Sequence, residues 1–237
     1  MIPTVRLLGG PADPRLLDVV PAWPRAKICV AIDGGTASGK TTWAAALVAA
    51  YELNAEQPGV VISQDWFLRP RRDRPDLHTR LAAGEIDESE YHRAMWDLSR
   101  FDDLLAWLGR WRRSPDAMTL RLDGLFDRAS GLASSSVRVT LEAACLVVVE
   151  GAGVLMPERG CEPDAAVWVE ASTIDMVIAR KYKRLRQREP DALFADVRSR
   201  YLSAERRHDL WIENVGRARA DWVLTCSNTG KAVLRHV

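Results

Sequence analysis

Short apolar runs recur along the chain and alternate with longer segments whose apolar residues follow a helical spacing. The short runs contain many β-branched residues, as is typical of strands that are buried on both faces of a parallel sheet. They lie at Lys27–Ile32, Val60–Ser63, Leu146–Val149, Ala166–Val169 and Asp221–Leu224. Because strands separated by helices usually form parallel sheets, the pattern predicts an α/β fold with a five-stranded parallel sheet covered by helices on both faces.

The segments between the apolar runs predict helices and loops of different kinds. Ser99–Trp111 repeats its apolar residues at the spacing of one helix face, and Asp116–Val139 alternates only weakly, which favours a hairpin or an irregular insertion. Further helices are expected at Thr42–Tyr51, Thr173–Gln187 and Asp191–Glu213, and a loop at Pro70–Pro75.

Composition and charge narrow the functional classes without choosing one. The 237 residues are enough for one α/β domain, and the net charge of +1 gives no basic field that would argue for nucleic acid as a partner. No apolar run is long enough to span a bilayer and no basic-then-apolar leader stands at the start, so we expect a cytoplasmic protein without a membrane partner. The four cysteines are scattered, which gives no support to a zinc site. The sequence leaves open whether the chain forms a homo-oligomer.

A glycine-rich stretch directly follows the first apolar run. Gly34–Thr41 has the pattern of a phosphate-binding loop, and its glycines permit the backbone angles that turn N–H groups toward a polyphosphate. Lys40 supplies a charge for the outer phosphates, the Thr41 hydroxyl is suited to Mg²⁺, and the following helix adds its positive end. The motif predicts that a nucleoside triphosphate is bound with Mg²⁺ by Gly34, Gly35, Thr36, Ala37, Ser38, Gly39, Lys40, Thr41 and Thr42.

Two carboxylates follow neighbouring predicted strands. Glu150 ends the run Leu146–Val149, and Asp65 comes shortly after Val60–Ser63. Because the carboxyl ends of parallel strands lie at the same edge of a sheet, both side chains are expected beside the phosphate-binding loop. A phosphate-binding loop needs an acidic partner for Mg²⁺, and we expect Thr41 and Glu150 to serve the metal.

These motifs, in their order along the chain, resemble one known family. The stretches Asp33–Thr42, Ile62–Phe67, Met95–Asp97 and Val149–Gly151 are similar to those of the uridine kinase group of P-loop kinases, which includes nicotinamide riboside kinases and phosphoribulokinases. The end of the chain is also similar, at Arg200–Leu202 and Arg219–Val223, so the resemblance spans about 27 to 225. It implies a single P-loop NTPase domain over 1–237, with an N-terminal extension at 1–25, an acceptor-binding insertion at about 66–140 and a small lid at about 180–195.

The resemblance implies an ATP-dependent small-molecule kinase that transfers phosphate to a hydroxyl group. Asp65 corresponds to the family's proposed general base, and Asp97 to an aspartate that holds ribose hydroxyls, although Asp97 is also suited to begin a helix near Ser99. Arg180, Arg184 and Arg188 recur every four residues and share one helix face, where the family has a lid whose arginines clamp phosphates. The expected catalytic residues are Asp65, Lys40, Arg184 and Arg188, with Arg180 on the nucleotide and Asp65, Phe67, Asp97 and Asp123 on the acceptor.

The acceptor half of the family pattern differs in this chain. The Tyr and His that read uracil in uridine kinases are missing from Leu120–Arg128, and Leu98-Ser99 stands where His-Pro usually follows the ribose aspartate. A nucleoside or other ribosyl compound is the expected acceptor, with its identity open. The arginines at 69, 71, 72 and 74 suit either an anionic substrate or a solvated loop, which keeps a nucleoside monophosphate kinase as an alternative. An ATP-binding regulatory protein without a small-molecule acceptor is the other alternative.

Overall fold

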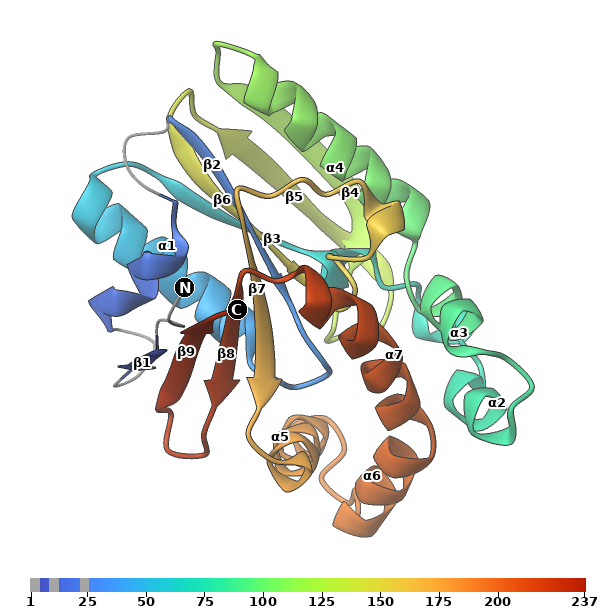
Figure 1. The fold of residues 1–237 in the computed structure, drawn as a ribbon. Coiled ribbons are helices and arrows are strands. Elements are labelled where there is room, and N and C mark those ends of the chain that lie inside the picture. The colour runs from blue at the N-terminus through green and yellow to red at the C-terminus, as the bar shows by residue number, and fades with distance from the viewer. Residues whose placement is uncertain (1–4, 9–12, 22–25) are drawn as a thin grey trace.

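The computed structural model describes residues 5–8, 13–21 and 26–237, and it centres on a twisted sheet (Figure 1). Seven strands form this sheet in the order β1–β9–β8–β7–β2–β6–β3. Their bounds are β1 Val5–Leu8, β2 Lys27–Asp33, β3 Gly59–Ser63, β6 Cys145–Gly151, β7 Ala165–Ala171, β8 Trp222–Cys226 and β9 Ala232–His236. The five predicted strands correspond to β2, β3, β6, β7 and β8, and every pairing among them is parallel.

The prediction of five strands was too low for the sheet as a whole. The chain reverses after β8, where Ser227 N bonds to Lys231 O at 2.8 Å, and β9 therefore returns antiparallel to β8. β1 then pairs antiparallel with β9 at the sheet edge. A short hairpin strand after a turn leaves little periodicity to detect, so the sequence pattern missed it.

The expected N-terminal extension lies partly outside the described residues, at 1–4, 9–12 and 22–25. Within the described part, the segment contains β1 and the 3₁₀ helix η1, Pro14–Val19. Leu16 and Val19 of η1 are buried in the cluster that also holds the apolar face of α1, Lys40–Ala55. The extension therefore contributes to the hydrophobic core.

The two faces of the sheet are covered by different elements, and alternate strand residues face each of them. On one face, Val30 of β2 and Leu47 of α1 belong to the same buried cluster. On the other, Ala31 clusters with Phe101 of α4, Leu98–Arg113, and with Leu125 of the hairpin that contains β4, Met118–Phe126, and β5, Ala133–Leu141. Helices on both faces, the helix α4 and the hairpin confirm the predicted α/β layering (Figure 1).

Further helices surround the carboxyl ends of the parallel strands (Figure 1). These are α2 Leu77–Ala83, α3 Glu88–Met95, α5 Ile174–Arg186, α6 Phe194–Arg200 and α7 Arg206–Gly216, with the short 3₁₀ helices η2 Gln64–Phe67 and η3 Arg71–Asp73. Two more 3₁₀ helices, η4 Pro157–Arg159 and η6 Arg217–Arg219, precede β7 and β8 in the chain. The sequence pattern did not predict α2 or α3. Among the described residues, no helix combines the length and apolar character that crossing a membrane requires.

The predicted continuous helix Asp191–Glu213 was wrong in two respects. A turn closed by Ala192 N on Glu189 O, at 3.0 Å, occupies the first residues, so the helix begins at Phe194. A π-helical turn, Tyr201–Glu205, then separates α6 from α7. Such turns insert an extra residue and occur frequently at functional sites.

Candidate active site

The loop Gly34–Thr41 connects β2 to α1, as the motif predicts. Gly34 has φ +152°, and a Cβ atom there would lie 2.1 Å from the backbone oxygen of Val169 on β7. Gly39 has φ +116° and begins α1. Only glycine suits these two positions, because one has no room for a side chain and both have backbone angles that L-residues avoid.

Two buried aspartates hold this loop from opposite sides. Asp33, at the end of β2, accepts hydrogen bonds from the backbone N–H of Gly34 at 2.7 Å, of Gly153 at 2.7 Å and of Leu155 at 2.9 Å. Asp209 of α7 accepts from Thr36 N at 2.8 Å. Asp33 thus links the loop to the segment after β6, and Asp209 links it to α7.

The sequence did not identify Asp209 as part of the site. An aspartate on an amphipathic helix resembles a solvated charge when only its neighbours in the sequence are known. In the structure it is buried, and it also accepts a hydrogen bond from the Tyr201 hydroxyl at 3.0 Å. Burial raises the pKa of its carboxyl, and the hydrogen bond from Thr36 N acts in the opposite direction.

Two cations bond to the backbone of the loop. Lys40 Nζ donates to the carbonyl oxygens of Gly34 and Gly35, each at 2.9 Å. Arg180 of α5 donates from Nη1 to the carbonyl oxygens of the two residues before Gly39, at 3.1 and 2.8 Å. Both charges therefore lie against the loop that is expected to bind phosphates.

Glu150, Thr41 and Ser63 form a compact set of oxygen atoms at the carboxyl end of the sheet. Thr41 Oγ1 donates to Glu150 Oε1 at 3.4 Å, and Ser63 Oγ donates to the same oxygen. Burial raises the pKa of the Glu150 carboxyl, while the nearby Lys40 charge lowers it. Hydroxyl and carboxylate oxygens are the ligands that Mg²⁺ prefers, and Mg²⁺ is commonly held by one or two carboxylates together with substrate phosphates. The predicted metal residues therefore fit a magnesium ion.

Asp65 lies on η2, immediately after β3. The Ser63 hydroxyl begins this 3₁₀ helix by accepting a hydrogen bond from Asp65 N at 3.3 Å. The Asp65 carboxylate forms an ion pair with Arg128, which follows β4 in the hairpin. The Asp65 side chain remains 32% exposed, so it is accessible from the cavity described next.

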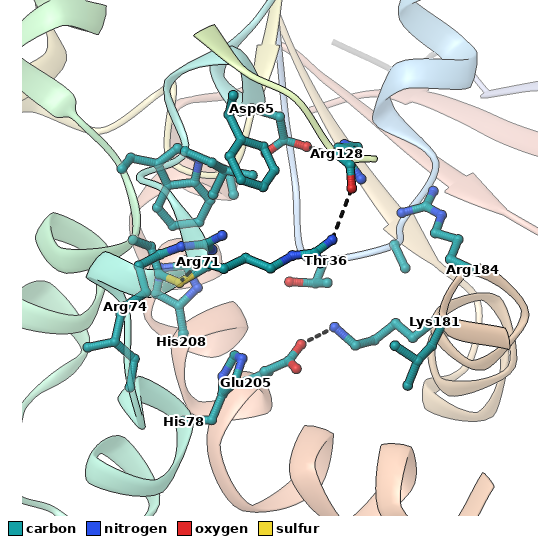
Figure 2. A pocket seen from close by; sticks show the side chains of 18 of the residues that line it. Thr36, Asp65, Arg71, Arg74, His78, Arg128, Lys181, Arg184, Glu205 and His208 are labelled. Carbon is teal, nitrogen blue, oxygen red and sulfur yellow. Dashed lines mark hydrogen bonds and ion pairs between the residues drawn. The ribbon is translucent and has the colours of Figure 1, made fainter. Parts of the chain in front are cut away.

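A cavity of about 460 Å³ joins the loop, the strand ends and the surrounding helices (Figure 2). On the loop side it is lined by Thr36, Ala37, Gly39, Lys40, Thr41, Asp65, Glu150, Ala152 and the α5 residues Lys181, Arg184, Leu185, with Arg188 and Glu189 beyond them. On the other side it is lined by Leu68, Arg71, Arg74, Leu77, His78, Tyr91, Met95, Trp96, Phe126, Arg128, Arg200, Glu205 and His208. We call the second set the distal wall.

A second cavity, of about 340 Å³, lies beyond the start of α1. Thr42, Arg180 and the turn between β8 and β9 contribute to its lining, the turn through Ser227 and Gly230. Gly39 and Arg184 line both cavities, so the two are adjacent at the loop.

The structure brings most, but not all, of the predicted site residues together. Asp65, Lys40, Arg184 and Arg188, predicted as catalytic, all line the first cavity. Three predicted acceptor residues do not line it. Phe67 is buried with its ring 5.6 Å from that of Phe101, Asp97 begins α4 by accepting from Arg100 N at 3.4 Å, and Asp123 on β4 pairs with Arg121 at 2.9 Å.

Sequence reasoning missed most of the distal wall, because helices α2 and α3 were not predicted. His208 of α7, which lines the wall, and His92 of α3 are both buried, and His92 Nδ1 lies 2.9 Å from His208 Nε2. Burial lowers the pKa of both imidazoles, so the pair is neutral at physiological pH. The chain offered no motif for this pair, since its members are far apart in sequence.

The ionisation of Asp33 should appear in the pH dependence of stability. Burial raises its pKa from 3.8 to about 6, so its contribution to stability is complete below pH 3.8 and is lost as the pH rises through 6. The full difference corresponds to about 3 kcal/mol. Compared with an Asp33→Asn variant, the wild type should lose about 2–3 kcal/mol of unfolding free energy between pH 4 and pH 7. Urea denaturation of both proteins at each pH measures this. A difference that does not change with pH would contradict the assignment.

Comparisons with known proteins support the fold. The sequence matches no protein-family model and no curated protein. Among solved structures, a candidate fructose transport system kinase from Silicibacter sp. TM1040 has a TM-score of 0.58 at 18% identity, over 85% of this chain and 91% of its own. A possible uridine kinase from Bacillus stearothermophilus has a TM-score of 0.58 at 17% identity, over 86% and 91%. D-glycerate 3-kinase from Cryptococcus neoformans has a TM-score of 0.53 at 13% identity, over 90% and 91%. The chain therefore has the fold of P-loop kinases, in agreement with the resemblance found in its sequence.

Proposed function

We propose that this protein is an ATP-dependent kinase that transfers the γ-phosphoryl group to a hydroxyl of a small metabolite. One observation carries the proposal: Lys40, Glu150 and Asp65, which come from three different segments, line a single cavity. A site that only binds ATP needs the loop with Lys40 and a carboxylate for the metal, here Glu150. Transfer to a hydroxyl also needs a second carboxylate that faces the same cavity and accepts the proton, here Asp65.

In this proposal ATP lies along the loop with its phosphates in the first cavity. The backbone N–H groups at the start of α1 and the Lys40 charge bind the phosphates, and Arg184 of α5 and Arg188, just after that helix, approach them from the lid. Burial lowers the pKa of Arg184, yet a guanidinium remains charged and able to stabilise the transferring group. The adenine base is assigned to the second cavity, between Arg180 and the turn at 227–230.

The residues present divide the reaction between them. The acceptor oxygen forms a bond to the γ-phosphorus, and the bond from that phosphorus to the β–γ bridging oxygen breaks, which releases ADP. The hydroxyl proton passes to the Asp65 carboxylate. Thr41 and Glu150 would hold Mg²⁺, whose chemistry is to neutralise charge on the β- and γ-phosphates. Arg128 pairs with Oδ2 of Asp65, which leaves Oδ1 to accept the proton.

The acceptor class is the finer part of the proposal. The sequence resemblance favours a nucleoside or another ribosyl compound. A nucleoside monophosphate kinase would instead transfer to a phosphate, and it would have no need of a base at Asp65. An ATP-binding regulatory protein would need neither Asp65 nor the distal wall, so the hydroxyl kinase is the function that the cavity supports best.

A coupled assay of ADP release tests the proposed function. Purified protein with ATP and Mg²⁺ should release ADP only when a suitable acceptor is present, across a panel of nucleosides, sugars, polyols, hydroxy acids and sugar phosphates. Phosphorus NMR of the product should show a phosphate ester. An anhydride product would favour the monophosphate kinase, and slow ADP release that no metabolite changes would favour the regulatory protein.

A further inference from the structure

Arg74 of the distal wall is a cation that has no carboxylate counter-ion among the described residues. Its guanidinium donates one long hydrogen bond, from Nη1 to the Met95 sulfur at 3.5 Å, and it lies 5.2 Å from the centre of the Phe126 ring. Its Nε is buried and has no hydrogen-bond partner in the described part of the chain. Burial lowers the pKa of the guanidinium, which nevertheless remains protonated.

Two other cations of the distal wall, Arg128 and Arg200, have carboxylate partners. Arg128 is paired with Asp65, and Arg200 lies 3.4 Å from Glu205, which also binds Lys181 across the cavity. Across residues 5–8, 13–21 and 26–237, no carboxylate comes within ion-pair distance of Arg74. A half-buried charge of this kind is unfavourable unless a ligand supplies the opposite charge.

Arg71 belongs to the same feature and its position is fixed. Its backbone N–H donates to Gly131 O at 3.0 Å, and its Nη2 donates to Arg128 O at 2.9 Å. Both bonds connect η3 to the hairpin. Their acceptors are carbonyl oxygens, so neither bond gives the Arg71 charge a carboxylate partner. Arg71 and Arg74 thus form a pair of cations, held on a short 3₁₀ helix and the residue after it, that line the same cavity.

Arg74 is separate from the cations that the donor nucleotide would use. Figure 2 shows Arg74 and His78 on the opposite side of the cavity from Lys181 and Arg184. The donor side has Lys40 on the loop, Arg184 on α5 and Arg188 just after that helix.

We propose that the acceptor carries an anionic group, a carboxylate or a phosphate, away from its reacting hydroxyl, and that Arg74 together with Arg71 binds this group. The inference rests on the proposed kinase function and deepens it. A planar guanidinium can hold either anion by two parallel hydrogen bonds, which also fixes the orientation of the ligand. The hydroxyl would then be directed toward Asp65. A neutral nucleoside or sugar would leave the Arg74 charge uncompensated.

Matched pairs of acceptors test the proposal directly. Glyceric acid is compared with glycerol, ribose 5-phosphate with ribose, and a nucleoside 5′-monophosphate with its nucleoside. Within at least one pair, the anionic member should have a kcat/KM about 10- to 100-fold above that of the neutral member, the ratio expected from a charge-assisted hydrogen bond. The carboxylate and phosphate arms show which anion is preferred.

A variant at Arg74 connects the preference to the residue. Arg74→Met should raise KM for the anionic acceptor about 10- to 100-fold and leave KM for ATP within about twofold, because only the acceptor touches this side chain. Arg71→Met should also raise KM for the anionic acceptor, and it is the variant to use if Arg74→Met does not fold. Arg72→Met is the matched control: Arg72 is 79% exposed, pairs with Asp73 at 3.5 Å and does not line the cavity. Its kinetics should equal those of the wild type.

The outcomes separate this inference from the proposed function. Higher activity with the neutral members, or an Arg74→Met variant with unchanged KM for the anion, overturns the inference and leaves the kinase standing. Calorimetry with the same anionic compounds gives a readout without turnover. If the protein phosphorylates none of the acceptors but binds the anionic compounds, and Arg74→Met weakens this binding, the anion site is supported and the kinase function is overturned. The absence of any binding and any turnover overturns both.

Discussion

Replacing Asp65 by asparagine is expected to lower kcat about 10²- to 10⁴-fold, the range for loss of a positioned general base. An amide has nearly the size of the carboxylate but cannot accept the hydroxyl proton. No hydrogen bond of the phosphate-binding loop involves Asp65, so the affinity for ATP should stay within about twofold. Steady-state kinetics with the best acceptor, together with calorimetric titration by ATP, measure both quantities.

The control for this variant is Asp73→Asn. Asp73 belongs to the next 3₁₀ helix, is solvent-exposed and does not line the cavity, so its loss should leave kcat unchanged. Full activity in Asp65→Asn would remove Asp65 from the role of base. A loss of ATP binding equal to the loss of kcat would instead assign Asp65 to the donor site.

The parts of the site that sequence predicted are those in which the local chain determines the geometry. Gly34 must lack a side chain because Val169 O lies where its Cβ would be, and that requirement appears in the sequence as a recognisable motif. Glu150 and Asp65 were predicted because each follows a short apolar run, and the parallel register puts Ser63 opposite Glu150 at the edge of the sheet. Strand ends and loop chemistry are local properties.

The distal wall is different, because it forms only when distant segments meet. Arg71 was visible as one of a cluster of arginines, but its neighbours His78 and Tyr91 lie on helices whose pattern is too short to detect. For Asp97, the family correspondence predicts contact with the acceptor, and that role stays a prediction; in the structure Asp97 begins α4, the role that its local sequence also favoured. The position of such residues depends on tertiary contacts, which cannot be predicted from the periodicity and motifs of a single sequence.

Helix α7 connects the two halves of the site. His208 lines the distal wall, while the next residue, Asp209, holds the backbone of the phosphate-binding loop through Thr36. Glu205, in the π-helical turn before α7, binds Lys181 of α5. A displacement of this segment would therefore change the acceptor wall, the loop and the lid helix together.

Replacing Lys40 by methionine is expected to impair both donor binding and turnover, which distinguishes it from Asp65→Asn. The Nζ atom lies against the loop, and loss of its charge removes a donor to the phosphates that is fixed before the reaction begins. Loss of one such preorganised donor lowers kcat by about 10²- to 10³-fold. KM for ATP should also rise about tenfold or more, because the charge binds the ground state as well as the transition state.

Lys40→Met also removes the two hydrogen bonds from Nζ to Gly34 O and Gly35 O. Because these bonds hold the loop, the stability of the variant has to be measured as well. Each bond contributes about 1 kcal/mol, so urea denaturation of Lys40→Met should show a free energy of unfolding lowered by about 1–2 kcal/mol. The variant should still be folded at neutral pH. Arg138→Met, which removes an exposed cation on β5 that lines neither cavity, is the control and should change neither the stability nor the kinetics. A folded Lys40→Met protein that keeps wild-type kcat and ATP affinity would show that the phosphates bind elsewhere, since no other feature of the loop could replace a full positive charge at that position.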